Sequence, residues 1–178
     1  MSRRRRLAFV GIAAAVFASI YSVGASVDLR EDDARELKDE FMKQVEDIDA
    51  IGIFLNNFRI AAAMFIPAFG VVVGVISAYS TGMVFNALAQ TTPELAGIHP
   101  LAILSTPFGL MEMFSYGVAM SQSAILINVI VRKQKIKPML IPTLILLGIV
   151  AGVLFASAFI EFYMIEAVTQ QVGPLETI

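Results

Sequence analysis

The sequence predicts an all-α, polytopic membrane protein: a helical bundle with about four spans. Hydrophobic residues make up 57 % of the 178 residues. The mean hydropathy of +0.76 is typical of helical membrane proteins and too high for a soluble domain of this length. Apolar runs of about 20 residues, the length that crosses a bilayer, recur along the chain. We therefore treat residues 1–178 as a single membrane domain.

The first apolar run follows four consecutive arginines, Arg3–Arg6. It predicts a first span over residues 7–27. The same pattern fits a signal peptide with a small-residue cleavage site at 23–25. The run is long for a signal segment, however, which favours an uncleaved anchor.

The next segment changes character, because residues 28–50 contain ten acidic and four basic residues. One narrow apolar stripe recurs there at helical spacing, formed by Leu37, Phe41, Val45 and Ile48. The pattern predicts an amphipathic acidic helix within an extramembrane segment, 28–57. Helices that bind membrane surfaces usually carry basic residues on the polar face. We therefore expect this helix to pack on its own protein or to dock a protein partner.

Three further spans are predicted at residues 58–80, 101–131 and 138–165. Pro67 is expected to kink the first of them, and Gly70 and Gly74 form a G-x-x-x-G pattern that permits close helix approach. An interrupted or re-entrant element is expected near 81–90, within a segment 81–100 that ends in a loop. A proline and a glycine break the next span near 101–108.

Two basic clusters bear on the orientation: Arg3–Arg6, and the four basic residues of the turn at 132–137. With four spans, three crossings separate the clusters, so the positive-inside rule cannot place both in the cytoplasm. A cluster before the first span usually dominates insertion. On that basis we expect a multi-pass cell-membrane protein with its N-terminus and C-terminus in the cytoplasm and its acidic helix outside. Plain counting of loop lysines and arginines favours the reverse orientation.

Two glutamates, Glu112 and Glu161, lie within the apolar spans. They are about 23 residues before and about 26 residues after residue 135, the centre of the basic turn, so they should lie at similar depth. Asn86 is expected at the same depth, which predicts a polar cluster of these three residues. Asn57 and Arg59 should enter from the opposite side, which disfavours an Arg59–Glu112 salt bridge.

Three roles are open to the glutamates. In a structural role, each glutamate is protonated or is capped by the backbone amides of the broken helix that begins at Pro107, because carboxylates are favourable near helix N-termini. They can instead handle ions or protons, or form a protein contact. A carboxylate within a span costs a few kcal/mol, on the order of 3, so each role must offset that cost.

Composition excludes most familiar chemistry. The chain has no cysteine and one histidine, His99, in a proline-flanked loop. Disulfides, thiolate sites and multi-histidine metal or haem sites within the chain are therefore excluded. The net charge of −2 gives no basic field for nucleic acid. We expect a protein without enzymatic activity, cofactor or nucleic-acid partner.

Four motifs, in order, resemble the stage II sporulation protein M family. They are "IFLNNFRIA" with Asn57, "VFNALA" with Asn86, "TPFGLMEM" with Pro107, Gly109 and Glu112, and "SAFIEFY" with Ala158, Ile160 and Glu161. The family pattern has an asparagine that opens a span, an Asn-Gly turn, Pro-His-Gly-x-x-Glu and a final Ala-x-x-Ile-Glu. This chain departs from it at Phe108, where the histidine would stand, and at Ala87, where the glycine would stand.

The resemblance covers roughly residues 1–165 and implies a membrane scaffold. Family members are similar to a sporulation protein that holds cell-wall-degrading partners at the membrane. We therefore expect a scaffold or accessory subunit of a larger membrane complex. It would contact other proteins through the helix at 28–50, and the lipid bilayer through its spans. The alternative is a component of a transporter or channel that uses Glu112 and Glu161.

Overall fold

The computed structural model describes residues 3–95 and 97–172, so residues 1–2, 96 and 173–178 of the expected domain lie outside the described residues. The elements are α1 (Arg3–Gly24), α2 (Glu31–Val45), α3 (Ala50–Met64), α4 (Phe69–Thr91), the 3-10 helices η1 (Pro93–Leu95) and η2 (Pro100–Ser105), α5 (Pro107–Val131) and α6 (Lys137–Val172). The described ranges contain no strand, which confirms the predicted all-α class.

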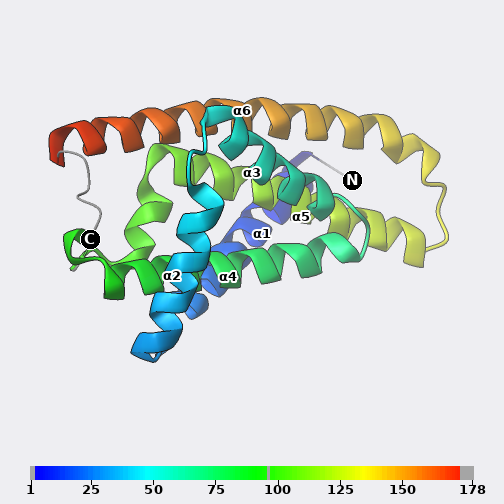
Figure 1. Cartoon of the computed structure of the whole chain (residues 1–178). Helices are drawn as coiled ribbons and strands as arrows, with labels where there is room; N and C mark the ends of the chain where they lie inside the picture. Colours follow the sequence, from blue (N-terminus) through cyan, green and yellow to red (C-terminus); the bar gives the residue numbers. More distant parts are fainter. Residues whose placement is uncertain (1–2, 96, 173–178) are drawn as a thin grey trace.

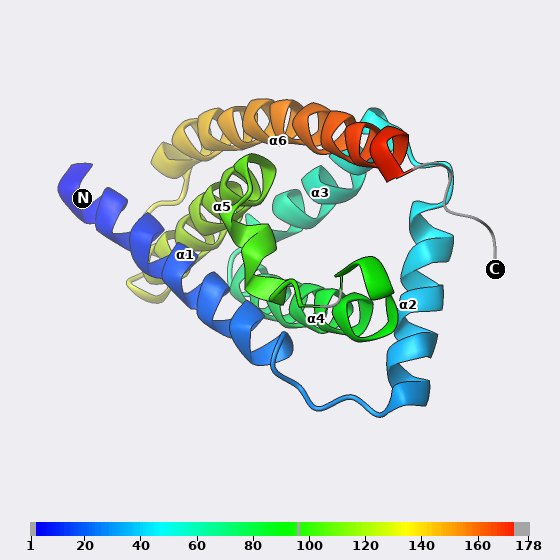
Figure 2. The same ribbon diagram turned by 90° about the vertical axis from the view of Figure 1, so that its left-hand side faces the viewer.

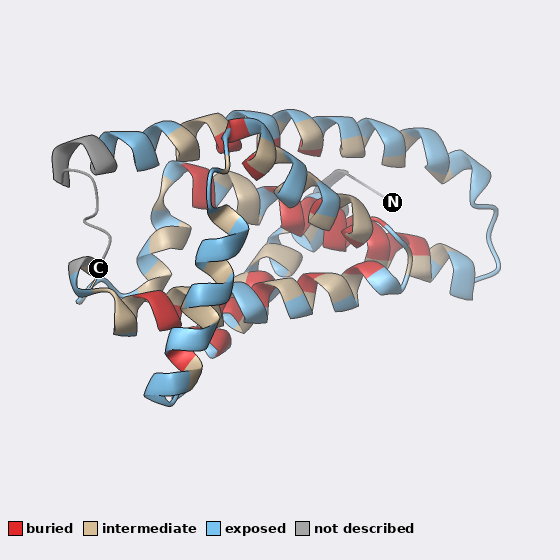
Figure 3. Cartoon of the chain, in the orientation of Figure 1, coloured by how far each residue is buried: buried red, intermediate tan, exposed pale blue. Residues whose placement is uncertain are grey.

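Four helices are long and apolar enough to cross a membrane: α1, α4, α5 and α6. Helix α5 lies at the centre of the bundle and has more buried positions than any other described helix (Figure 3). Helix α1 crosses α4 and α5 obliquely, and α2 lies across the end of the bundle where α4 finishes (Figures 1 and 2). Most of α6 faces outward, with large apolar side chains such as Ile141 and Leu144 exposed, as expected of a lipid-facing helix.

The predicted span 58–80 is wrong in its boundaries, because the chain breaks between α3 and α4. A proline disfavours the α conformation in the residue that precedes it. Helix α3 ends at Met64, three residues before Pro67. Ala68 then adopts a positive φ of 66° with ψ of −47°, and the Phe69 amide donates to the Pro67 carbonyl at 2.8 Å. This γ-turn reverses the chain, so Pro67 ends a helix instead of kinking one.

The re-entrant element expected near 81–90 is also absent, because these residues continue α4 as regular helix. Helix α4 buries a small-residue stripe at every fourth position, formed by Gly70, Gly74, Ala78 and Gly82. Such a stripe lets neighbouring backbones approach closely. The interruption expected near 101–108 is confirmed: η2 ends at Ser105 and α5 begins at Pro107.

The acidic helix is confirmed as α2, although it is shorter than the predicted 28–50. The predicted extramembrane segment 28–57 includes residues 50–57, which form the first half of α3. Helix α3 is apolar and has 15 residues, about 22 Å of helix, which is less than the ~30 Å hydrocarbon core.

The direction of α3 changes the topology. The Asn57 side chain of α3 donates to Glu112 of α5, and Ser123, farther along α5, donates to the Ile66 carbonyl just after α3. The two helices therefore run parallel. Helix α4 brings the chain back, with Gly70 packed against Ser123. The pair α3–α4 thus forms a hairpin that enters and leaves the bundle from the same end.

Helices α1 and α6 run antiparallel to α5. In α1, Ala14 packs against Gly117 of α5. Closer to the C-terminal end of α1, the Tyr21 hydroxyl donates at 2.8 Å to the carbonyl of Pro100, which precedes α5 in the sequence. In α6, the early residue Thr143 accepts from Gln122 near the end of α5. The late residue Ser157 donates to the Phe108 carbonyl at the start of α5.

These directions place both basic clusters at one end of the bundle. Arg3–Arg6 begin α1 at the level where α5 ends, and the turn at 132–137 follows α5 directly. The expectation that the clusters lie on opposite sides is wrong, because α3 adds one more pass along the bundle than the four predicted spans give. The described end of α6 lies at the other end of the bundle, where α2 lies (Figure 1). The two chain ends, which were expected on one side, lie outside the described residues.

Candidate functional site: a carboxylate-lined cavity beside the acidic helix

The motif "TPFG" forms the corner that positions the site. The Thr106 hydroxyl caps α5 by accepting from the Gly109 amide at 3.0 Å, and Pro107 occupies the first turn, where its missing N–H costs nothing. A Cβ at Gly109 would collide with the Ile103 carbonyl of η2. The glycine therefore allows η2 to fold back against the start of α5, and Glu112 lies one turn farther along.

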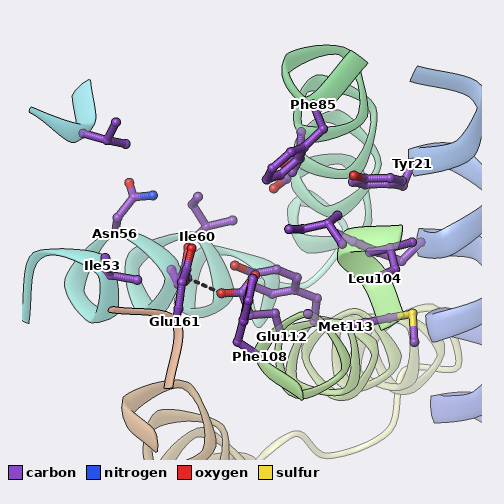
Figure 4. A pocket seen from close by; sticks show the side chains of 18 of the residues that line it. Tyr21, Ile53, Asn56, Ile60, Phe85, Leu104, Phe108, Glu112, Met113 and Glu161 are labelled. Atoms are coloured by element: carbon purple, nitrogen blue, oxygen red, sulfur yellow. Dashed lines mark hydrogen bonds between the residues drawn. The ribbon is translucent and has the colours of Figure 1, made fainter. Parts of the chain in front are cut away.

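A cavity of about 180 Å³ lies between this corner and the neighbouring helices. Its walls come from α1, α3, α4, η2, α5 and α6, with the C-terminal part of α2 and Ile48 in the loop after it (Figure 4). Most of the lining is apolar or aromatic. The polar lining side chains include Asn56, Asn57, Glu112 and Glu161.

Glu112 has a defined partner in this cavity. The Asn57 amide nitrogen donates to its Oε1 at 2.6 Å across the α3–α5 contact. Thr106, and not the glutamate, caps the exposed amides of α5, so the capping role considered for Glu112 is wrong. The expected separation of Asn57 from Glu112 is also wrong, because α3 enters the bundle from the end where α5 begins.

Glu161 reaches the same cavity from α6, and Figure 4 shows both glutamates beside the space. Its Oε2 is shielded from solvent and has no hydrogen-bond partner among the described residues. Because both glutamates line one cavity, the expected convergence of Glu112 and Glu161 is observed. Two carboxylates in one cavity repel each other when both are ionised, and a cation or a shared proton relieves that repulsion.

No lysine, arginine or histidine occurs among the described residues that line the cavity. Arg59 is exposed and donates to the Asn56 oxygen at 3.3 Å. The described ion pairs are both on or beside α2, between Arg30 and Asp33 and between Arg35 and Glu31. The predicted absence of an Arg59–Glu112 salt bridge agrees with these contacts.

Helix α2 covers the cavity with part of its apolar stripe. Phe41, Val45 and Ile48 line the space, and Ala34 is buried where α2 packs on α4. The acidic residues of α2 face mainly outward. At the start of α2, the hydrogen bond from Arg30 lowers the pKa of Asp33.

Asn86 lies outside this cluster, which corrects the predicted set. Its side chain donates at 2.7 Å to the Val27 carbonyl in the α1–α2 connection and accepts from Gln90. Asn86 therefore holds the connection to the acidic helix. Asn57 lies beside Glu112, in the place that was expected for Asn86.

Sequence reasoning missed the aromatic walls and the covering role of α2. Tyr21, Phe85 and Tyr116 line the cavity from α1, α4 and α5. The stripe at Phe41 and Val45 was visible in the sequence, but periodicity does not say which surface a stripe covers. His99 lies in a loop as expected, where its Nδ1 accepts from the Leu101 amide.

The described residues contain no group of three or more histidine, cysteine or acidic side chains that could hold a metal ion. The polar groups of the site include two carboxyl groups, two neutral amides and the hydroxyls of Ser77 and Thr81, set among aromatic and aliphatic side chains. It can accept hydrogen bonds and stabilise positive charge.

The fold and the cavity define a class: a multi-helix membrane protein with an interrupted span and two carboxylates in its interior. The chain belongs to the stage II sporulation protein M family, whose family model matches residues 7–164. Comparison with curated proteins and with solved structures finds no match.

Proposed function

We propose that the protein is a non-enzymatic membrane scaffold or accessory subunit of a larger membrane complex, and that α2 docks a partner protein. The observation that carries this proposal is the outward acidic face of α2. Its apolar stripe contacts the protein itself, while Glu36, Asp39 and Glu40 are exposed. A partner with a basic surface fits this face by charge complementarity.

The arrangement of the basic clusters supports a cytoplasmic N-terminus. Arg3–Arg6 and the turn at 132–137 together contain eight basic residues and no acidic ones. With both clusters at one end of the bundle, the positive-inside rule favours that end in the cytoplasm. The partner of α2 would then bind from the side of the membrane that faces away from the cytoplasm. Nucleic acid is not proposed as a partner.

The test is the mass of the complex after gentle detergent extraction from the native membrane. We expect the chain to migrate with a partner. A variant that combines Glu36→Lys, Asp39→Lys and Glu40→Lys should lose it. The matched control reverses three charges at the other end: Lys133→Glu, Lys135→Glu and Lys137→Glu. A monomer without a partner, or equal loss in both variants, would contradict docking through α2.

A second candidate function, a component of a transporter or channel, is favoured by the cavity that contains Glu112 and Glu161. Ionisable groups inside membrane proteins often mark substrate or ion pathways. Flux into proteoliposomes tests this function. Uptake or conductance should fall in Glu112→Gln, and flux equal to that of the unmodified protein would remove the candidate.

A further inference from the structure

We propose that the cavity binds the ammonium group of a small organic cation between Glu161 and Glu112. The volume of about 180 Å³ exceeds the roughly 150 Å³ of an engineered cavity that accommodates benzene. An amine with a short alkyl or aryl body therefore fits. The inference is independent of docking through α2, because it concerns the interior of the bundle.

Two carboxyl groups without a basic neighbour favour a cationic ligand. Both glutamates line a space whose described lining has no basic side chain, and Asn57 supplies one neutral donor to Glu112. The shielded Oε2 of Glu161 has no donor. Buried charges without partners are costly, and an ammonium group offers three donors and a compensating charge.

The walls favour an organic cation over a metal ion. Tyr21, Phe85 and Tyr116 present aromatic rings to the same cavity (Figure 4 labels the first two). Aromatic faces attract ammonium groups and also contact an apolar ligand body. Calcium instead requires six to eight oxygen ligands, whereas this lining is mainly apolar.

The exposed acids of α2 provide attraction at longer range. Asp39 and Glu40 lie near the covering residue Phe41, so cations are concentrated at this end of the bundle. The ammonium group can come from a free amine or from the ethanolamine headgroup of a lipid. Both present the same chemistry to the glutamates.

The test compares two probes of nearly equal shape, benzylammonium and neutral benzyl alcohol. Binding is measured by calorimetry with the full-length protein in phosphatidylglycerol nanodiscs, whose lipid contains no amine, and empty nanodiscs give the background. We expect benzylammonium to bind at least tenfold more tightly than benzyl alcohol. Glu161→Gln should weaken that binding at least tenfold. Glu166→Gln, at an exposed position of the same helix, should leave it unchanged.

A second variant, Glu112→Gln, keeps an acceptor for Asn57 and should also weaken benzylammonium binding, while circular dichroism confirms that each variant retains its helices. Equal binding of the two probes, no binding of benzylammonium, or equal effects of Glu161→Gln and Glu166→Gln would overturn the proposal.

The source of the ammonium group is distinguished by adding phosphatidylethanolamine to the nanodiscs. If the lipid is the source, it displaces benzylammonium from the unmodified protein. If a free amine is the source, benzylammonium affinity stays the same. Both results support an ammonium site, provided that the affinity depends on Glu161.

Discussion

At the scale of single residues, neighbouring asparagines have different roles. Asn57 is partly buried and donates to Glu112, whereas Asn56 is exposed and accepts from Arg59. The sequence "NN" does not distinguish them, because a rotation of 100° along a helix separates their side chains. Only the docking of α3 on α5 decides which asparagine meets the glutamate.

Asn57→Ala should therefore destabilise the protein by about 1–3 kcal/mol, the cost of leaving a buried acceptor without its donor. Asn56→Ala is the matched control and should change stability by no more than about 0.5 kcal/mol. The measurement is reversible unfolding in mixed detergent micelles, followed by circular dichroism. Equal losses in the two variants would show that the Asn57–Glu112 contact contributes little.

At the scale of elements, the α3–α4 reversal depends on a strained residue. Ala68 is exposed and adopts a positive φ, a region in which glycine has no steric penalty. Ala68→Gly should stabilise the fold by about 1 kcal/mol, since relief of strain exceeds the entropy cost of glycine. Ala63→Gly, inside α3, should instead destabilise it by about 1 kcal/mol. Thermal unfolding measures the change in stability of each variant. A loss of stability in both variants would argue against strain at Ala68.

The α1–α4 contact depends on the absence of a side chain at Gly82. A Cβ there would collide with the Tyr21 carbonyl and lie 2.8 Å from the Ala25 nitrogen. Gly82→Ala should force the helices apart and cost about 1–3 kcal/mol. Gly148→Ala, where nothing lies within 4 Å, should leave stability unchanged or slightly raised. Thermal unfolding of both variants checks this, and a neutral Gly82→Ala would contradict the close backbone contact.

At the scale of the whole molecule, the hairpin α3–α4 decides the sidedness of every later segment. The chain has no cysteine, so single-cysteine variants report sidedness without background. In sealed cells, a membrane-impermeant maleimide should label Asp39→Cys but not Arg4→Cys or Gln134→Cys. All three should react after lysis. Different accessibility at positions 4 and 134 would contradict the shared end.

The sequence by itself determined the helical membrane class, the acidic helix, the interruption at Pro107 and the pairing of Glu112 with Glu161. Each of these follows from local composition, helical spacing or turn chemistry. Only the tertiary structure decided that Pro67 ends a helix, that Asn57 replaces Asn86 beside Glu112, and that α2 covers a cavity. The place of Asn57 and the cover over the cavity depend on packing between segments distant in the sequence. The reversal at Pro67 is local, but an apolar run has the same composition whether it continues as one helix or turns back.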